Sequence, residues 1–196
     1  MKDLKYLMSY SIALIAFIGI LLGGPYVYLA VVYTFVFIPF LELNLDQHIQ
    51  TYTDDEKVNR NLDPFFDFLL YLNLPLVYGM FFLSLNTLAN SNSTYEIIGI
   101  ILSASIVMAT NGINVGHELG HRKSLLSRTC SKLLYLPCQY MHFFIEHNWG
   151  HHINVATPED PATARYKQNI YSFWITSVVR TYISAWKIQL RLLKVS

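Results

Sequence analysis

Long apolar runs, separated by short polar breaks, dominate the first 115 residues of the chain. They cover residues 6–22, 26–41, 65–88 and 95–115. Each run is close to the roughly 20 residues that a helix needs to cross a bilayer. Because backbone polar groups in lipid must be satisfied within their own segment, each run predicts a transmembrane helix. The Gly-Gly-Pro break after the first run predicts a tight helical hairpin.

Three further segments have a mixed pattern. Residues 42–63 are polar and acidic and predict a water-exposed connector, in which His48 is a plain polar residue. Residues 125–145 are moderately apolar and predict a helix that lies at the interface or dips into the bundle. Residues 170–193 are amphipathic, with basic residues spaced along them, and predict an interfacial helix or the start of a fifth span.

Composition supports a membrane protein. Hydrophobic residues make up 53% of the 196 residues and charged residues only 14%, whereas soluble domains carry roughly 25% charged residues. The net charge of +1 argues against a nucleic-acid-binding protein built on a basic surface. Two cysteines are too few for a disulfide framework. The fold class predicted is therefore an all-α, polytopic transmembrane helical bundle forming a single membrane domain over residues 1–196.

Basic residues predict the orientation of this bundle, because positive charge collects on the cytoplasmic side. Lys2 and Lys5 flank the first run, and Arg122 and Lys123 follow the fourth. The breaks at residues 23–25 and 89–94 contain no basic residue. Four spans with basic flanks place both ends of the bundle, and the histidines that follow it, in the cytoplasm.

Histidine is the first chemical signal, because six of the seven histidines fall between positions 117 and 152. His117 and His121 are spaced i, i+4 and share one face of a helix, as do His147 and His151. His152 is displaced by roughly 100° from His151 on a regular helix, so it serves a second metal or another side of the same one. His142 lies outside both spacings. Imidazole clusters suit Zn, Fe, Cu or Ni, and scarce carboxylates disfavour Mg or Ca.

Acidic residues close to these clusters are candidates to orient the imidazoles, because a metal-bound histidine usually donates its second N–H to a carboxylate or carbonyl. Glu118 and Glu146 are the strongest candidates, and Glu159 and Asp160 are also near in sequence.

The segment His-Glu-Leu-Gly-His at 117–121 also matches the HExxH motif of zinc proteases, in which the glutamate is the general base. A membrane metalloprotease is therefore one alternative, although it leaves the second cluster at 147–152 without a purpose. A non-catalytic membrane protein with a structural metal is another.

Three segments resemble one family. They are NVGHELGHRKS at 114–124, HFFIEHNWGHH at 142–152 and VATPEDPATAR at 155–165. The chain resembles the membrane-bound alkane 1-monooxygenases, or alkane hydroxylases, of the wider fatty-acid desaturase and hydroxylase superfamily. Trp149 departs from the family, which more often has a basic or polar residue there.

The resemblance implies a non-haem diiron enzyme of the bacterial inner membrane. With O₂ it would hydroxylate medium- or long-chain n-alkanes terminally to primary alcohols, with electrons from rubredoxin and rubredoxin reductase. A fatty-acyl desaturase or hydroxylase is the nearest alternative. The implied catalytic and metal-binding residues are His117, His121, His147, His151 and His152. The family has further histidines in its C-terminal half, so we expect an N-terminal fragment that is inactive alone.

Overall fold

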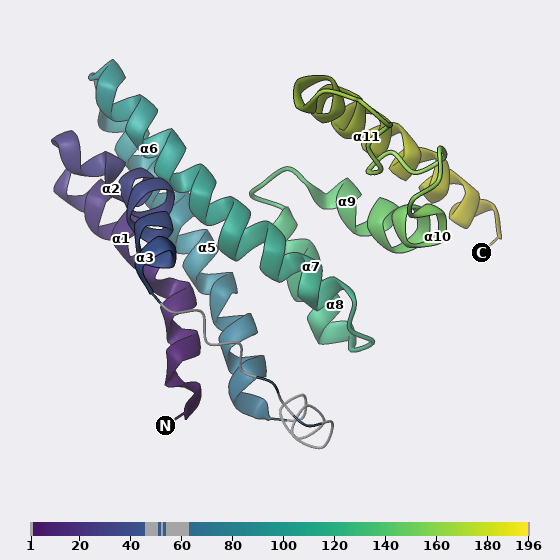
Figure 1. Cartoon of the computed structure of the whole chain (residues 1–196), viewed down its shortest axis with the longest axis horizontal. Helices are drawn as coiled ribbons and strands as arrows, with labels where there is room; N and C mark the ends of the chain where they lie inside the picture. The colour runs from purple at the N-terminus through teal and green to yellow at the C-terminus, as the bar shows by residue number, and fades with distance from the viewer. Residues whose placement is uncertain (1, 46–50, 52, 54–62, 196) are drawn as a thin grey trace. The chain divides into compact units, whose positions relative to one another are not determined.

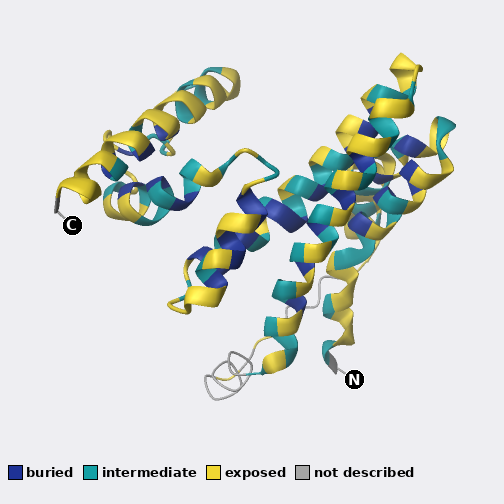
Figure 2. Ribbon diagram, turned by 180° about the vertical axis from the view of Figure 1, so that it is seen from behind, coloured by how far each residue is buried: buried dark blue, intermediate teal, exposed yellow. Residues whose placement is uncertain are grey.

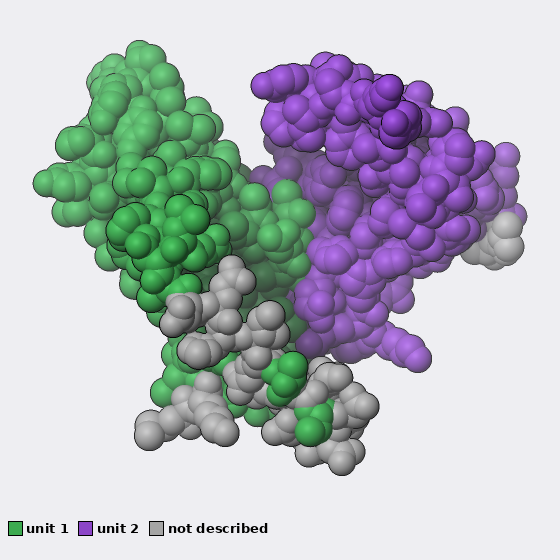
Figure 3. Space-filling model, viewed as in Figure 1, with its two compact units in different colours: residues 1–115 green, residues 116–196 purple. Residues whose placement is uncertain are grey.

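The computed structural model describes residues 2–45, 51, 53 and 63–195. Helices and turns make up this part of the chain, and it contains no β-strand (Figure 1). Contacts divide the chain into two compact units, residues 1–115 and 116–196 (Figure 3). The sequence predicts one membrane domain, and that stays a prediction. His48 lies outside the described residues.

Each apolar run forms one or more consecutive helical segments, and the last of them continues from the first unit into the second. These segments are η1 (Lys2–Tyr10), α1 (Ser11–Leu22), η2 (Gly24–Tyr28), α2 (Leu29–Val32), η3 (Tyr33–Phe37), α3 (Ile38–Asn44), α5 (Pro64–Asn90), α6 (Thr94–Val107), η4 (Met108–Ile113) and α7 (Asn114–Gly120). η1 and η2 are 3-10 helices, whereas η3 and η4 are π-helical turns. Joined end to end, they give four helices long and apolar enough to cross a membrane: Asp3–Leu22, Gly24–Asn44, Pro64–Asn90 and Thr94–Gly120. The prediction of an all-α, multi-pass membrane protein is confirmed.

Glycine makes the first hairpin possible. Gly23 and Gly24 have φ of 67° and 55°, which residues with a Cβ rarely adopt. The backbone N–H of Gly24 donates to Glu96 Oε1 at 2.6 Å, which ties the turn to the start of α6. The α5 helix begins at an Asp63 cap that accepts from Phe65 N at 2.9 Å and runs through Pro75 to Asn90.

Small and apolar side chains form the core of the first unit. Its buried members are Ala13, Ala16, Ile20, Val27, Ala30, Met80, Ile100 and Val107. Small residues at such contacts let membrane helices approach closely. Two buried amides lie among these helices: Asn111 Nδ2 donates to Asn73 Oδ1 at 2.8 Å, and Asn73 Nδ2 donates to Leu69 O at 2.8 Å. Figure 2 shows exposed residues along the outer faces, as lipid contact requires.

The second unit contains shorter helices. They are α8 (Leu125–Tyr135), α9 (Met141–Glu146), the π-helical turn η5 (His147–His151), α10 (His152–Asn154) and α11 (Ile170–Val195). The prediction of one helix over 125–145 is wrong, because the chain turns between α8 and α9. Pro137 lacks the N–H that a continuing helix needs, and Gln139 has a positive φ of 53°. The amphipathic segment at 170–193 is helical, as α11, and packs against α9.

Candidate metal centre

The first histidine pair is fixed by close packing of two helices. His117 lies on α7 and His121 directly follows it. Gly116 faces the ring of Tyr135, where a Cβ would meet ring carbon Cε1 at 3.0 Å. Ser131 Oγ donates to the backbone carbonyl of Gly116 at 2.5 Å. Glycine at 116 therefore lets α7 pack against α8, and the buried hydroxyl fixes the helix that presents the first two imidazoles.

The second histidine cluster lies on a π-helical turn. The backbone N–H of His152 donates to the carbonyl of His147, five residues earlier. Such i→i+5 turns are rare and often occur at functional sites. This turn brings His152 above His147, with their Nε2 atoms 3.1 Å apart. The sequence-based expectation of a 100° displacement assumed a regular helix, which the structure does not have here.

Three imidazole nitrogens meet at one point. The Nε2 of His117 lies 2.7 Å from that of His147 and 2.9 Å from that of His121. The Nε2 atoms of His147 and His121 are 3.2 Å apart. Nitrogens that share one metal at 2.0–2.1 Å lie roughly 3 Å from one another. These three residues therefore form a group that could hold a metal ion, and His152 adds a fourth nitrogen beside it.

Hydrogen bonding cannot explain this convergence. A neutral imidazole Nε2 carries either one proton or one lone pair, so it takes part in a single well-directed hydrogen bond. Three mutually contacting Nε2 atoms can thus form at most one such bond. A shared cation satisfies all the lone pairs at once, and imidazole is a preferred ligand of iron, zinc and copper. The residues present fit a transition metal.

The protonation state of His147 agrees with binding of a transition metal. Burial, followed by the proximity of the other four imidazoles, lowers the pKa of His147 to about 3. The pKa of His152 is also lowered, by burial and then by His121 and His151. Both rings are therefore neutral near pH 7, which is the form that binds metals.

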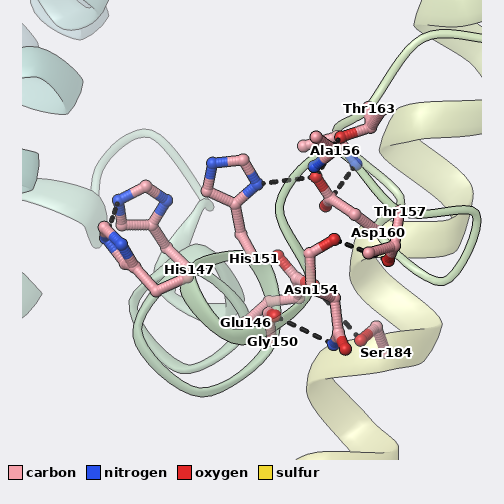
Figure 4. Close-up of polar contacts among 12 residues, drawn as sticks. Glu146, His147, Gly150, His151, Asn154, Ala156, Thr157, Asp160, Thr163 and Ser184 are labelled. Carbon is pink, nitrogen blue, oxygen red and sulfur yellow. Dashed lines mark hydrogen bonds and ion pairs between the residues drawn. The ribbon is translucent and has the colours of Figure 1, made fainter.

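His151 is held differently from the other four. Its Nδ1 lies 2.9 Å from Asp160 Oδ2, and its ring stacks on His147 with centroids 5.2 Å apart. Asp160 is only 2% exposed and also accepts hydrogen bonds from Ala162 N and Thr163 Oγ1. Figure 4 shows the second nitrogen of the His151 ring on the edge away from Asp160, on the side of His147. This is the carboxylate–histidine pairing typical of metal ligands.

The other acidic candidates lie elsewhere. Glu146 is buried, and its Oε1 accepts from Ser184 Oγ on α11 at 3.2 Å. Burial raises the pKa of Glu146, with a smaller opposing effect of the Ser184 bond. Glu118 and Glu159 are exposed. The roles predicted for Glu118 and Glu146 remain predictions. Asp160, which the sequence named as a weaker candidate, is the acidic residue that contacts His151.

His142 is not part of the convergent group. Its ring contacts those of Tyr140 and Tyr182, with centroids 4.7 Å and 5.2 Å away. The structure therefore gathers His117, His121, His147 and His152 and holds His151 beside them. His142, on α9, lies between aromatic rings and not in this group.

Comparison with known proteins agrees with this arrangement. The fatty acid desaturase family model matches residues 94–195, which include both histidine clusters. The chain belongs to the fatty acid desaturase family. Within this family it is similar to alkane 1-monooxygenase of Pseudomonas putida, at 42% identity over 124 residues, covering 62% of this chain and 30% of that protein.

Two other relatives align with almost the whole of this chain. Alkane 1-monooxygenase 2 of Alcanivorax borkumensis is 28% identical over 99% of the chain and 53% of its own length. The xylene/toluene monooxygenase hydroxylase component of Pseudomonas putida is 30% identical over 99% of the chain and 52% of its own length. The chain thus spans between about a third and a half of these relatives. The resemblance to alkane hydroxylases is confirmed.

Proposed function

We propose that this chain supplies histidine ligands to a non-haem iron centre that hydroxylates the terminal methyl group of n-alkanes, giving primary alcohols. The observation that carries the proposal is the convergence of Nε2 atoms from His117, His121 and His147 within 3.2 Å of one another. The relatives are named alkane 1-monooxygenases, and the membrane helices suit a substrate that dissolves in the bilayer.

His117, His121, His147 and His152 would hold metal through Nε2, and His151 would present its Nε2 toward a second iron. Asp160 accepts the Nδ1–H of His151 and so keeps the Nε2 lone pair free. Phe143 stacks on His147 with centroids 4.8 Å apart and limits rotation of that ring. Bound iron would supply the electron-transfer chemistry that activates O₂.

A complete diiron centre needs more ligands than these five, and we propose that further histidines come from outside this segment. The same proposal includes two irons, electrons from rubredoxin and rubredoxin reductase, and a site on the cytoplasmic side of the bacterial inner membrane. Basic residues around the histidine clusters, such as Arg122 and Lys123, support this orientation.

A zinc protease built on the 117–121 motif agrees less well with the geometry. Catalytic zinc sites combine three protein ligands with an open position for water. In this chain a fourth imidazole, that of His152, lies beside the other three. A fatty-acyl desaturase or hydroxylase would use the same metal ligands, so only the product separates it from an alkane hydroxylase.

Metal content and product together test the proposal. The chain is purified in detergent after growth with iron and zinc, and elemental analysis measures both metals in wild type, His147→Ala and the matched control His142→Ala. We expect iron in wild type and in the control, and its loss in His147→Ala. Zinc without iron would overturn the oxygenase. Cells that express this segment together with the region that supplies the further histidines receive an n-alkane or an acyl lipid. Gas chromatography then identifies the products, and the proposal requires a primary alcohol from the alkane.

A further inference from the structure

A cavity lies in the unit formed by residues 116–196. It has a volume of about 590 Å³ and is lined by residues of α8, of the α9–η5 segment and of α11. This volume falls within the roughly 300–1,000 Å³ of small-molecule pockets. None of the five histidines at 117, 121, 147, 151 and 152 lines it. The cavity therefore has no part in holding the proposed metal.

Most of the cavity wall is apolar. Leu136, Ile145, Trp149, Trp186 and Leu192 contribute aliphatic and aromatic surface. Apolar walls with a few polar groups are typical of sites that bind small molecules with a hydrocarbon part. An alkyl chain placed between these side chains would be removed from water, which is favourable in proportion to the apolar area buried.

One part of the wall is cationic. Arg128 and Lys132 are spaced i, i+4 on α8 and both line the cavity. The Arg128 guanidinium lies 5.6 Å from the ring centroid of Phe144 and 5.9 Å from that of Trp149, and Lys132 Nζ lies 5.0 Å from Phe144. Aromatic rings thus hold both cations at the cavity.

Among the described residues, no carboxylate pairs with these two cations. No acidic residue lines the cavity, and within the described ranges neither Arg128 nor Lys132 forms an ion pair with an acidic side chain. The nearby Glu146 is buried and bonded to Ser184 instead. Two uncompensated cations beside an apolar wall create a positive potential that favours an anionic ligand group.

A buried imidazole nitrogen adds a second polar feature. His142 lines the cavity, and its Nε2 is buried without a hydrogen-bond partner among the described residues. Burial lowers the pKa of His142, so the ring is neutral near pH 7. A buried polar atom without a partner costs free energy. A ligand polar group could satisfy it, together with the amides of Gln139 and Gln189 in the same wall.

We propose that this cavity binds a long-chain amphiphile with an anionic head group. The carboxylate or phosphate contacts Arg128 and Lys132, and the hydrocarbon chain lies along Trp149 and Trp186. The head group belongs either to a free long-chain carboxylate or to an anionic membrane lipid. Neutral molecules of the same length would gain only the apolar contacts. This site is independent of the metal centre.

The chain carries its own optical probe for this site. Two of its three tryptophans, Trp149 and Trp186, line the cavity, whereas Trp174 does not. Trp174→Phe therefore leaves emission from the cavity alone. The purified chain in detergent is titrated at mildly alkaline pH, where the carboxylate is ionised, with doxyl-labelled stearate and with its neutral methyl ester. We expect saturable quenching by the acid at concentrations where the ester quenches weakly.

Charge variants test the head-group contact. Arg128→Gln with Lys132→Gln should weaken binding of the acid by roughly tenfold or more, since two charge-assisted contacts are lost. The exchange Arg128→Lys with Lys132→Arg should retain binding. The matched control, Lys187→Gln with Arg191→Gln, removes two charges from α11 outside the cavity and should bind as wild type does. Circular dichroism verifies that each variant is folded.

Competition identifies the natural source of the head group. Displacement of the probe by hexadecanoate but not by phosphatidylglycerol supports a free carboxylate, and the reverse supports a membrane lipid. Failure of both to displace it overturns the proposal. Equal quenching by the acid and its ester, or equal loss of binding in the cavity and control variants, also overturns it.

Discussion

Replacement of Asp160 should destabilise the second unit and release His151. The buried carboxylate accepts from His151 Nδ1 at 2.9 Å, from Ala162 N at 2.9 Å and from Thr163 Oγ1. In Asp160→Ala all three donors lose their acceptor. Hydrogen bonds to a charged group are worth about 1.5–3 kcal/mol each. The side chain of His151 is 25% exposed and Ala162 is exposed, so water replaces most of these two bonds. We therefore expect about 2–4 kcal/mol off the free energy of unfolding, mainly from the bond to Thr163.

The conservative change separates shape from charge. Asp160→Asn keeps the volume and the acceptor for Ala162 but places an NH₂ group where His151 needs an acceptor. Its loss should be smaller, about 1–2 kcal/mol. Unfolding is followed by circular dichroism in detergent. Glu159→Gln is the matched control, because it removes an exposed neighbouring carboxylate and should stay within about 0.5 kcal/mol of wild type.

Histidine tautomers give a second, independent readout. Asp160 favours the proton on Nδ1 of His151, so ¹⁵N spectra of histidine-labelled chain should show that tautomer in wild type and a larger Nε2–H population in Asp160→Asn. An unchanged tautomer, or equal stability of Asp160→Ala and Glu159→Gln, would refute the reasoning.

Three other predictions concern packing and ionisation. Gly99→Ala should destabilise by about 1–3 kcal/mol, since its Cβ would lie 2.3 Å from Val27 Cγ2. Gly79→Ala, with its nearest contact at 3.4 Å, should be neutral, and thermal unfolding followed by circular dichroism compares the two. Asn111→Ala should cost about 1 kcal/mol in denaturant unfolding, because it removes a buried amide contact between helices, and no loss would mean that the bond contributes nothing. Burial raises the pKa of the Cys138 thiol to about 11, so its alkylation, followed by mass spectrometry, should still accelerate between pH 9 and 11; a plateau near pH 9 would contradict this.

The membrane helices were predictable because lipid permits few alternatives. A run of some 20 apolar residues in a bilayer has to form its own hydrogen bonds, so residues 6–22 and 95–115 could be assigned from pattern alone. The i, i+4 spacing of His117 and His121 was equally informative, because His117 lies on α7 and His121 directly follows the last residue of that helix. In both cases the structure depends on contacts that are local in sequence.

The remaining features depend on contacts that sequence spacing does not contain. Asp160 reaches His151 only because the chain turns back after α10 (Figure 4). Proximity in sequence instead favoured Glu146, whose carboxylate is bonded to α11. The helix predicted over 125–145 ends at Tyr135, because Pro137 lacks the N–H that a continuing helix needs. A count of apolar residues does not register that missing donor.

The π-helical turn at His147–His151 has a consequence for how this site tolerates change in length. Such a turn is in effect one residue inserted into a regular helix. Removing one residue between His147 and His151 would leave His152 four residues after His147, so a regular helix could keep it beside His147. In a regular helix of the present length, by contrast, His151 would take the place that His152 has beside His147. The two adjacent histidines are chemically identical, and only helical phase distinguishes the one that faces the convergent nitrogens from the one that faces Asp160. The site thus depends on helical phase as much as on its residues, because the extra residue of the π-helical turn places His152, and not His151, beside His147.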